Sequence, residues 1–107
     1  MRQEYTEGSG NIFKDMGSSN PDEKVAKAEL AFIINKIIKE RKLTQKQAAD
    51  ILRIDQPKVS ALNHGKLQGF SIERLFSFLR ALDQRIDIVV HNKPRGSEDK
   101  MIHVAYA

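Results

Sequence analysis

The stretch that decides the fold runs from residue 44 to residue 66 and reads TQKQAADILRIDQPKVSALNHGK. It opens with Thr44 in a Thr-x-x-Gln capping-box pattern, which predicts that a short helix begins there. Asp55 is a second N-cap, and its helix carries a proline in the first turn, where no intrahelical donor is lost. This helix ends at His64, because Gly65 suits the left-handed turn that commonly follows a helix. The stretch therefore predicts two short helices with a tight connection.

The apolar residues of this stretch fit two helices packed against each other. Helices that are separated by three residues cross steeply, so they need a small side chain at their contact, and Ala49 supplies it. The residues predicted to point inward are Ala48, Leu52, Ile54, Val59 and Leu62. The second helix keeps an outer face that consists of Gln56, Pro57, Lys58, Ser60, Ala61 and Asn63. This outer face is the candidate binding surface.

A longer helix is predicted before this stretch, from about Asn20 to about Arg41. Asn20 can cap it, Pro21 suits its first turn, and Glu23 completes a capping-box pattern. At about 100° per residue, one broad apolar face is formed by Ala26, Leu30, Ile33, Ile34, Ile37 and Ile38. A narrower apolar strip on the other side contains Val25, Ala28 and Phe32. This strip either packs against the N-terminal arm or forms a binding site for a partner protein.

The chain after the stretch predicts a further helix and then a strand. Ser71 caps the helix, and Phe70 can close on Leu75 as a hydrophobic staple. The buried face predicted for this helix consists of Ile72, Leu75, Phe76, Leu79 and Leu82. Residues 85–90 have strand composition, and residues 101–106 are a candidate second strand.

The predicted organisation is one domain between two tails. Residues 1–19, with several glycines and serines around a short apolar island, are interpreted as a flexible arm. Residues 20–91 form the domain, and residues 92–107 form a polar linker and tail. The expected fold class is mainly α, with four helices and a short C-terminal strand that is either alone or paired with residues 101–106.

The composition favours a polyanionic partner and argues against several kinds of site. The 107 residues carry a net charge of +4, and the segment from Lys36 to Lys46 holds five cationic residues and one acid. The alternative for this cluster is an ordinary solvated face. Cysteine is absent, which excludes disulfides and thiolate metal sites. The three histidines lack ligand spacing and Ser60 has no base beside it, so we expect no metal, no cofactor and no enzyme activity.

Neither a membrane span nor a secretory signal is predicted. The longest apolar run, around Leu30 to Ile34, is far too short to cross a bilayer. The first residues have no apolar stretch behind them, as a secretory signal would. We therefore expect a cytoplasmic protein that does not associate with membranes.

The stretch resembles the helix-turn-helix of the phage-repressor-like family, of the XRE or Cro/C1 type. The matching positions are Gln45, Ala49, Ile54, Val59, Ser60, Leu62, Gly65 and Lys66. The sequence departs from the family at Arg53, which stands where the family usually has a turn glycine. If the backbone is left-handed there, a residue other than glycine costs on the order of 1 kcal/mol. Its exposed side chain can reach a phosphate.

The resemblance implies double-stranded DNA as the partner and assigns roles to individual residues. The positions implied to read bases in the major groove are Gln56, Pro57, Lys58 and Ala61. A glutamine amide can pair with both groups on the edge of adenine, a lysine can donate to guanine, and an alanine can touch a thymine methyl. The positions implied to bind or face phosphates are Gln45, Lys39, Lys42, Lys46, Arg53, Ser60, Asn63 and Lys66. Phosphate contacts position the protein without specifying the sequence.

A broader resemblance, over roughly residues 8–91, is to HigA-type antitoxins, which are autorepressing partners of RelE-like toxins. It is carried by Ser9 to Phe13, by Gly65 to Leu67, by Phe70 to Leu75 and by the predicted strand after Leu82. It implies a transcriptional repressor that is the antitoxin of a toxin–antitoxin pair. The alternatives are a free-standing phage-type regulator and a toxin-binding module that does not read DNA.

Two protein interfaces are expected. The toxin is expected to bind the arm and the outer strip of the first helix, at Ile12, Phe13, Met16, Val25, Ala28 and Phe32. A homodimer is expected through the predicted strand, at Arg85, Ile86, Ile88 and Val90, because a lone strand leaves backbone groups unpaired. Such a dimer would bind a roughly palindromic operator. The alternative is a hairpin within one chain, made with residues 101–105.

Overall fold

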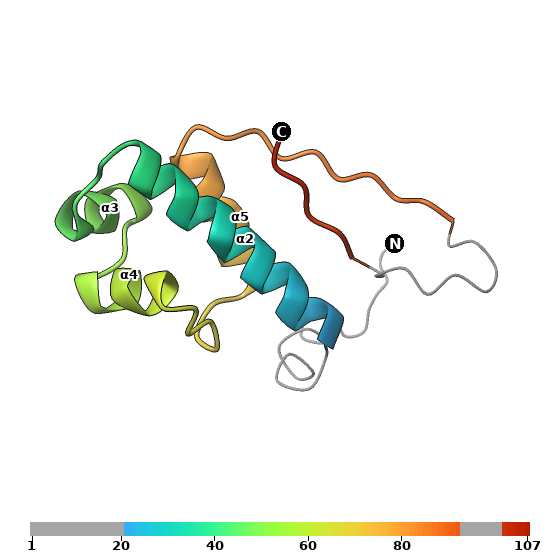
Figure 1. Cartoon of the computed structure of the whole chain (residues 1–107), viewed down its shortest axis with the longest axis horizontal. Coiled ribbons are helices and arrows are strands. Elements are labelled where there is room, and N and C mark those ends of the chain that lie inside the picture. The colour runs from blue at the N-terminus through green and yellow to red at the C-terminus, as the bar shows by residue number, and fades with distance from the viewer. Residues whose placement is uncertain (1–20, 93–101) are drawn as a thin grey trace.

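One long helix and three short ones build the protein in the computed structural model, which describes residues 21–92 and 102–107. The helices are α2 (Pro21–Glu40), α3 (Gln45–Leu52), α4 (Gln56–Asn63) and α5 (Ile72–Ala81). Figure 1 shows α3 and α4 together beside one end of α2, while α5 lies against α2. The interpretations of residues 1–19 as an arm and of Asn20 as a cap lie outside the described residues.

The long helix α2 buries the face that the sequence predicts. Its buried residues are Glu23, Ala26, Leu30, Ala31, Ile33, Ile34, Ile37 and Ile38. Ala31 and Glu23 extend the predicted face at its margins. The opposite strip is exposed, with 69% of the surface of Phe32 and 37% of that of Val25 open to solvent. The prediction that this strip lies outside the core is confirmed.

The core forms where α2 meets the three short helices. Its largest fully buried apolar side chains are those of Ile34, Val59, Leu62, Leu75 and Leu82. They come from α2, from α4 and from the region of α5, so the helix-turn-helix is held by the flanking helices. Full burial of one such side chain stabilises the fold by roughly 1.5–3 kcal/mol.

The buried face of α5 is rotated from the predicted one. Phe78 is buried, while Phe76 and Ile72, which were expected inside, are half-buried. The ring of the buried Phe70 meets the ring of Phe78 edge-on, with the ring centroids 5.8 Å apart. Phe70 is therefore a core residue. Its contact with Phe78 brings Phe78 into the buried face of α5.

All four described helices end in the same kind of turn, in which a residue with left-handed backbone follows the last turn. These residues are Lys42 (φ 56°), Arg53 (φ 61°), Gly65 (φ 73°) and Asp83 (φ 63°). The next amide in each case donates to a carbonyl five residues back, in the pairs Leu43–Ile38, Ile54–Ala49, Lys66–Ala61 and Gln84–Leu79, at 2.9–3.1 Å. This is the Schellman motif, which satisfies carbonyls that a helix end leaves without a partner. The predicted left-handed turn at Gly65 is confirmed.

The predicted C-terminal strand is not confirmed. Residues 85–90 form no strand within the described part of the chain, and the same holds for residues 102–106. The tail instead lies against α2, where the Val104 amide donates to Glu29 Oε1 at 3.3 Å. The Lys36 ammonium lies 5.8 Å from the centroid of the Tyr106 ring. Because these contacts hold the tail on α2, the hairpin considered above does not form between the described segments.

Candidate DNA-binding interface

The first helix of the motif, α3, is fixed by a reciprocal cap. Thr44 Oγ1 accepts a hydrogen bond from the Gln47 amide at 3.1 Å, and Gln47 Oε1 accepts one from the Thr44 amide at 2.9 Å. Both bonds satisfy donors that the first turn would otherwise leave unpaired. The cap leaves Gln45 and Lys46 exposed in the first turn of α3. Anions bind well at such a turn, because free amides and the helix dipole point toward them.

The second helix of the motif, α4, is capped in a different way. Asp55 Oδ1 accepts a hydrogen bond from the Lys58 amide at 2.9 Å, and Pro57 occupies the first turn. The two helices pack against each other, and Ala48 and Ala49 are both buried. The short connection and the small contact residues hold α3 and α4 as one rigid pair.

The two sides of α4 differ sharply. Val59 and Leu62 are completely buried, whereas Gln56, Pro57 and Lys58 are exposed. Three further positions were predicted to point outward, and of these Asn63 is exposed, while Ser60 and Ala61 are half-buried. Four of the six predicted outer positions are thus exposed, and the other two are half-buried. The polar first turn of α4 projects from a helix whose inner side is locked into the core.

The predicted phosphate-facing residues lie around this helix pair and on its flanks. Exposed side chains are those of Lys39, Lys42, Gln45, Lys46, Arg53, Asn63 and Lys66. The cationic run before α3 also contains Arg41, whose Nη2 donates to the Leu82 carbonyl at 2.7 Å. That bond links the end of α2 to the end of α5, so Arg41 has a structural role that the sequence did not reveal.

Two further contacts within the motif were not predicted. His64 Nδ1 lies 2.7 Å from the Ser60 carbonyl, so this nitrogen carries the proton and donates to the last turn of α4. Asn35 on α2 donates from Nδ2 to the Leu62 carbonyl at 3.0 Å. The second contact has no local signal in the sequence, because its two residues lie 27 positions apart.

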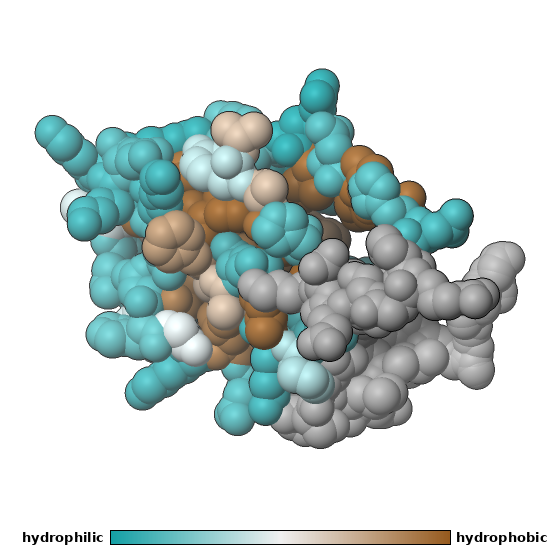
Figure 2. All heavy atoms as spheres, turned by 45° about the vertical axis from the view of Figure 1, so that its right-hand side comes forward, coloured by the Kyte–Doolittle hydropathy of each residue, from teal (hydrophilic) through white to brown (hydrophobic). Residues whose placement is uncertain are grey.

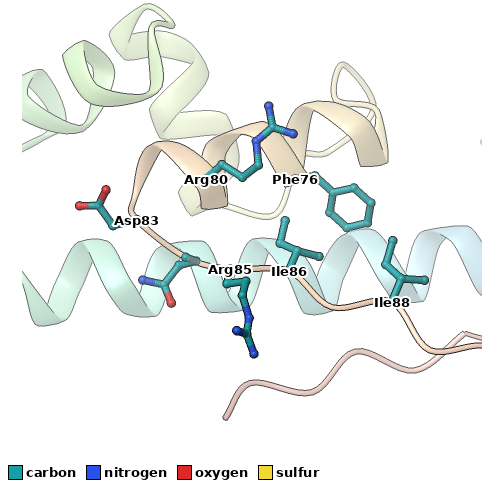
Figure 3. A pocket seen from close by; sticks show the side chains of 7 residues that line it. Phe76, Arg80, Asp83, Arg85, Ile86 and Ile88 are labelled. Carbon is teal, nitrogen blue, oxygen red and sulfur yellow. The ribbon is translucent and has the colours of Figure 1, made fainter.

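A shallow groove lies on the far side of α5, outside the helix-turn-helix. It has a volume of about 580 Å³ and is lined by Phe76, Arg80, Asp83, Gln84, Arg85, Ile86 and Ile88. Figure 3 shows Ile86 and Ile88 projecting from the extended segment toward Phe76 on α5. Within the described residues, no group of three or more histidines and carboxylates is placed to hold a metal ion. Among the same residues, no helix has the length and apolar character that crossing a membrane requires.

The backbone at Arg53 is left-handed, which is the condition under which a residue other than glycine is strained there, and its side chain is exposed. Arg53→Gly should relieve the local strain and raise the free energy of unfolding by up to about 1 kcal/mol, as measured by urea denaturation. It should also weaken binding to duplex DNA if Arg53 contacts a phosphate as the sequence predicts, because a positive charge is lost. Arg53→Lys keeps both the strain and the charge, and it should bind DNA like the unaltered chain. Equal DNA affinity for the glycine and lysine variants would show that this side chain makes no phosphate contact.

Comparisons with known proteins agree with this geometry. The profile of a helix-turn-helix domain family matches residues 12–91. A solved structure described as an XRE-family transcriptional regulator is 46% identical to this chain, with a TM-score of 0.75. The match covers 80% of this chain and 97% of that one. Among curated proteins, none matches the sequence significantly. The chain therefore belongs to the XRE-type helix-turn-helix family.

Proposed function

We propose that this DNA-binding transcriptional regulator is a sequence-specific repressor that inserts α4 into the major groove of its operator. The observation that carries the proposal is the contrast between the two sides of α4. Gln56 and Lys58 are exposed in its first turn, while Val59 is completely buried one residue later. The major groove, about 12 Å wide, admits a helix held in this way. The similar solved structure, which is described as an XRE-family transcriptional regulator, supports the regulatory part of this proposal.

The chemistry of the exposed turn fits base recognition. The Gln56 amide can pair with the N6 and N7 groups of adenine, and the Lys58 ammonium can donate to O6 or N7 of guanine. Pro57 adds only shape and apolar contact, since it has no backbone donor. Ala61 is half-buried one turn further along, where its methyl group can touch that of thymine. Phosphates at the flanks would meet the exposed cations described above.

Gln56→Ala tests the assignment of the reading helix. The variant should lose about 1–3 kcal/mol of binding free energy on the preferred duplex and show relaxed sequence preference, measured by fluorescence anisotropy. Lys42→Ala is the matched control, because it removes a phosphate contact and should weaken all sequences alike. Unchanged preference in the Gln56 variant would mean that α4 is not the reading helix.

We further propose a homodimer that forms through residues 85–90. Among the described residues, no backbone hydrogen bond involves this segment, and Ile88 and Val90 are 72% and 88% exposed. Unpaired amides and carbonyls beside exposed apolar side chains favour pairing with a second strand. A second copy offers the same segment in the antiparallel direction around a two-fold axis. Two α4 helices would then lie about 34 Å apart and read a roughly palindromic operator.

A toxin is the partner that we propose for the outer strip of α2. Phe32 is 69% exposed there, and Val25 and Ala28 lie on the same side of the helix. On the face of the molecule that Figure 2 draws, apolar surface reaches the solvent between hydrophilic residues. An exposed aromatic ring of this kind is typical of a protein interface. The arm residues Ile12, Phe13 and Met16, which we assign to the same interface, lie outside the described residues.

The proposal that this strip binds a toxin can be tested with Phe32→Ser. This change, alone or with Phe13→Ser, should abolish co-purification with a RelE-like toxin from the neighbouring gene, because the ring would anchor the contact. The melting temperature and the affinity for DNA should change little, since Phe32 lies outside the core. Val89→Ser removes a similarly exposed apolar side chain elsewhere and should leave capture intact. Capture that survives in the double variant would mean that the strip is structural and does not bind the toxin.

A further inference from the structure

Asn35 links the long helix to the end of the reading helix. Its Nδ2 donates to the carbonyl oxygen of Leu62 at 3.0 Å, across 27 residues of sequence. This carbonyl lies in the last turn of α4, where helix carbonyls lack intrahelical partners. It also accepts a hydrogen bond from the Gly65 amide at 3.2 Å. The two donors together saturate the oxygen and fix its direction.

Stability alone does not explain an amide at this position. Asn35 Oδ1 is buried and has no hydrogen-bond partner among the described residues. The penalty for a buried acceptor without a partner is at least as large as the net gain from one neutral hydrogen bond. The neighbouring helix positions Ile34 and Ile38 are both buried, so a leucine at position 35 would continue the apolar character of this part of α2. What the amide adds here is therefore a directional hydrogen bond, which constrains the orientation of α4.

Direction matters because the other contacts of α4 with the core are apolar. Val59 and Leu62 are completely buried, and apolar contacts resist separation more than they resist small rotations. Six residues separate Leu62 from Gln56, a distance of about 9 Å along the helix axis. A tilt of about 10° at Leu62 would therefore move Gln56 by about 1.6 Å. Such a shift exceeds the tolerance of a hydrogen bond to a base edge.

We propose that Asn35 is a positioning residue that sets the angle of α4 for base reading. This inference rests on the proposed function, because it concerns how the same helix meets the groove. Asn35 itself touches no DNA. The bond acts on the sequence preference of the protein, while the cations at the flanks supply affinity for any duplex.

The test uses the full chain and two DNA probes. One is a duplex selected from a random library by the unaltered protein, and the other is a scrambled duplex of the same length. Asn35→Leu should lower the ratio of the two affinities at least tenfold and leave the affinity for the scrambled duplex within twofold. An unchanged ratio would overturn the proposal. If the unaltered protein selects no duplex at all, the proposed function itself fails.

A matched control separates positioning from stability. Arg41, in the turn that follows α2, makes a comparable bond to the Leu82 carbonyl at the end of α5, at 2.7 Å. Arg41→Lys keeps the charge but weakens this planar contact, and it should leave the ratio of affinities unchanged. Asn35→Ala, assayed well below its melting temperature, should lose preference as the leucine variant does. If the Arg41 variant loses preference equally, or if both Asn35 variants fail to fold, Asn35 is a structural residue and the proposal is wrong.

Discussion

Raising the salt concentration from 50 to 200 mM should weaken the binding of the proposed dimer to the proposed operator by about 10⁴-fold. If each protomer neutralises about four phosphates, a dimer neutralises about eight, and the slope of log Kobs against log salt is about −7. The groups that we expect to contact the phosphates are the exposed cations around the helix pair: Lys39, Lys42, Lys46, Arg53 and Lys66. Each contact with a phosphate releases counterions from the DNA into the bulk solution. This release is more favourable when the bulk salt concentration is low, so low salt favours the complex.

Variants that each lack one positive charge show how much a single contact contributes to this slope. Lys42→Ala should reduce the slope by about 1.8 units per dimer, since one contact is lost in each protomer. Arg41→Gln removes a charge that is already directed to the Leu82 carbonyl, and it should change the slope less. Anisotropy titrations at five salt concentrations measure both. A slope near zero for the unaltered chain would contradict the proposed electrostatic contact with DNA.

Blocking the segment at residues 85–90 should convert the dimer into a monomer and weaken operator binding at least a hundredfold. Val89→Pro with Val90→Pro removes two successive amide donors, one of which would face the partner in an antiparallel pair. Both valines are exposed, at 72% and 88%, so the fold of the protomer should be kept. A protomer that binds alone contacts one half-site and neutralises half as many phosphates.

Light scattering and the salt slope report the outcome independently. The proline variant should have the mass of one chain and a slope of about −3.6. Val89→Thr with Val90→Thr keeps the amides and favours strands, so it should remain dimeric. A proline variant that dimerises as tightly as the unaltered chain would remove residues 85–90 from the interface.

Local chemistry was the part of the structure that the sequence predicted well. The caps at Thr44, Asp55 and Ser71 each involve an amide three residues away, so the partners are visible in the sequence itself. The left-handed turn at Gly65 has the same local origin. The helical period also identified the outer strip of α2. The exposed first turn of α4 followed from these local features, because the buried positions define its other side.

The features that the sequence did not predict depend on distant partners. The bond from Asn35 to Leu62 spans 27 residues and that from Arg41 to Leu82 spans 41, and neither has a local signature. The buried arc of α5 shifted because Phe70 packs on Phe78, a contact that periodicity within one helix cannot show. The composition of residues 85–90 favours a strand, but a strand forms only when a second strand pairs with it. Composition alone cannot show whether that second strand is present.

Selection from a random duplex library by the unaltered full-length protein is the most direct test of α4 as a reader of operator sequence. After several rounds at moderate salt, sequencing should show an enriched, roughly palindromic site with half-site centres about 34 Å apart, one helical turn. The same selection with Gln56→Ala should lose information at the base pairs that this side chain contacts and keep it elsewhere. A library that stays random with the unaltered protein, or an enriched site that is identical with the Gln56 variant, would contradict the account.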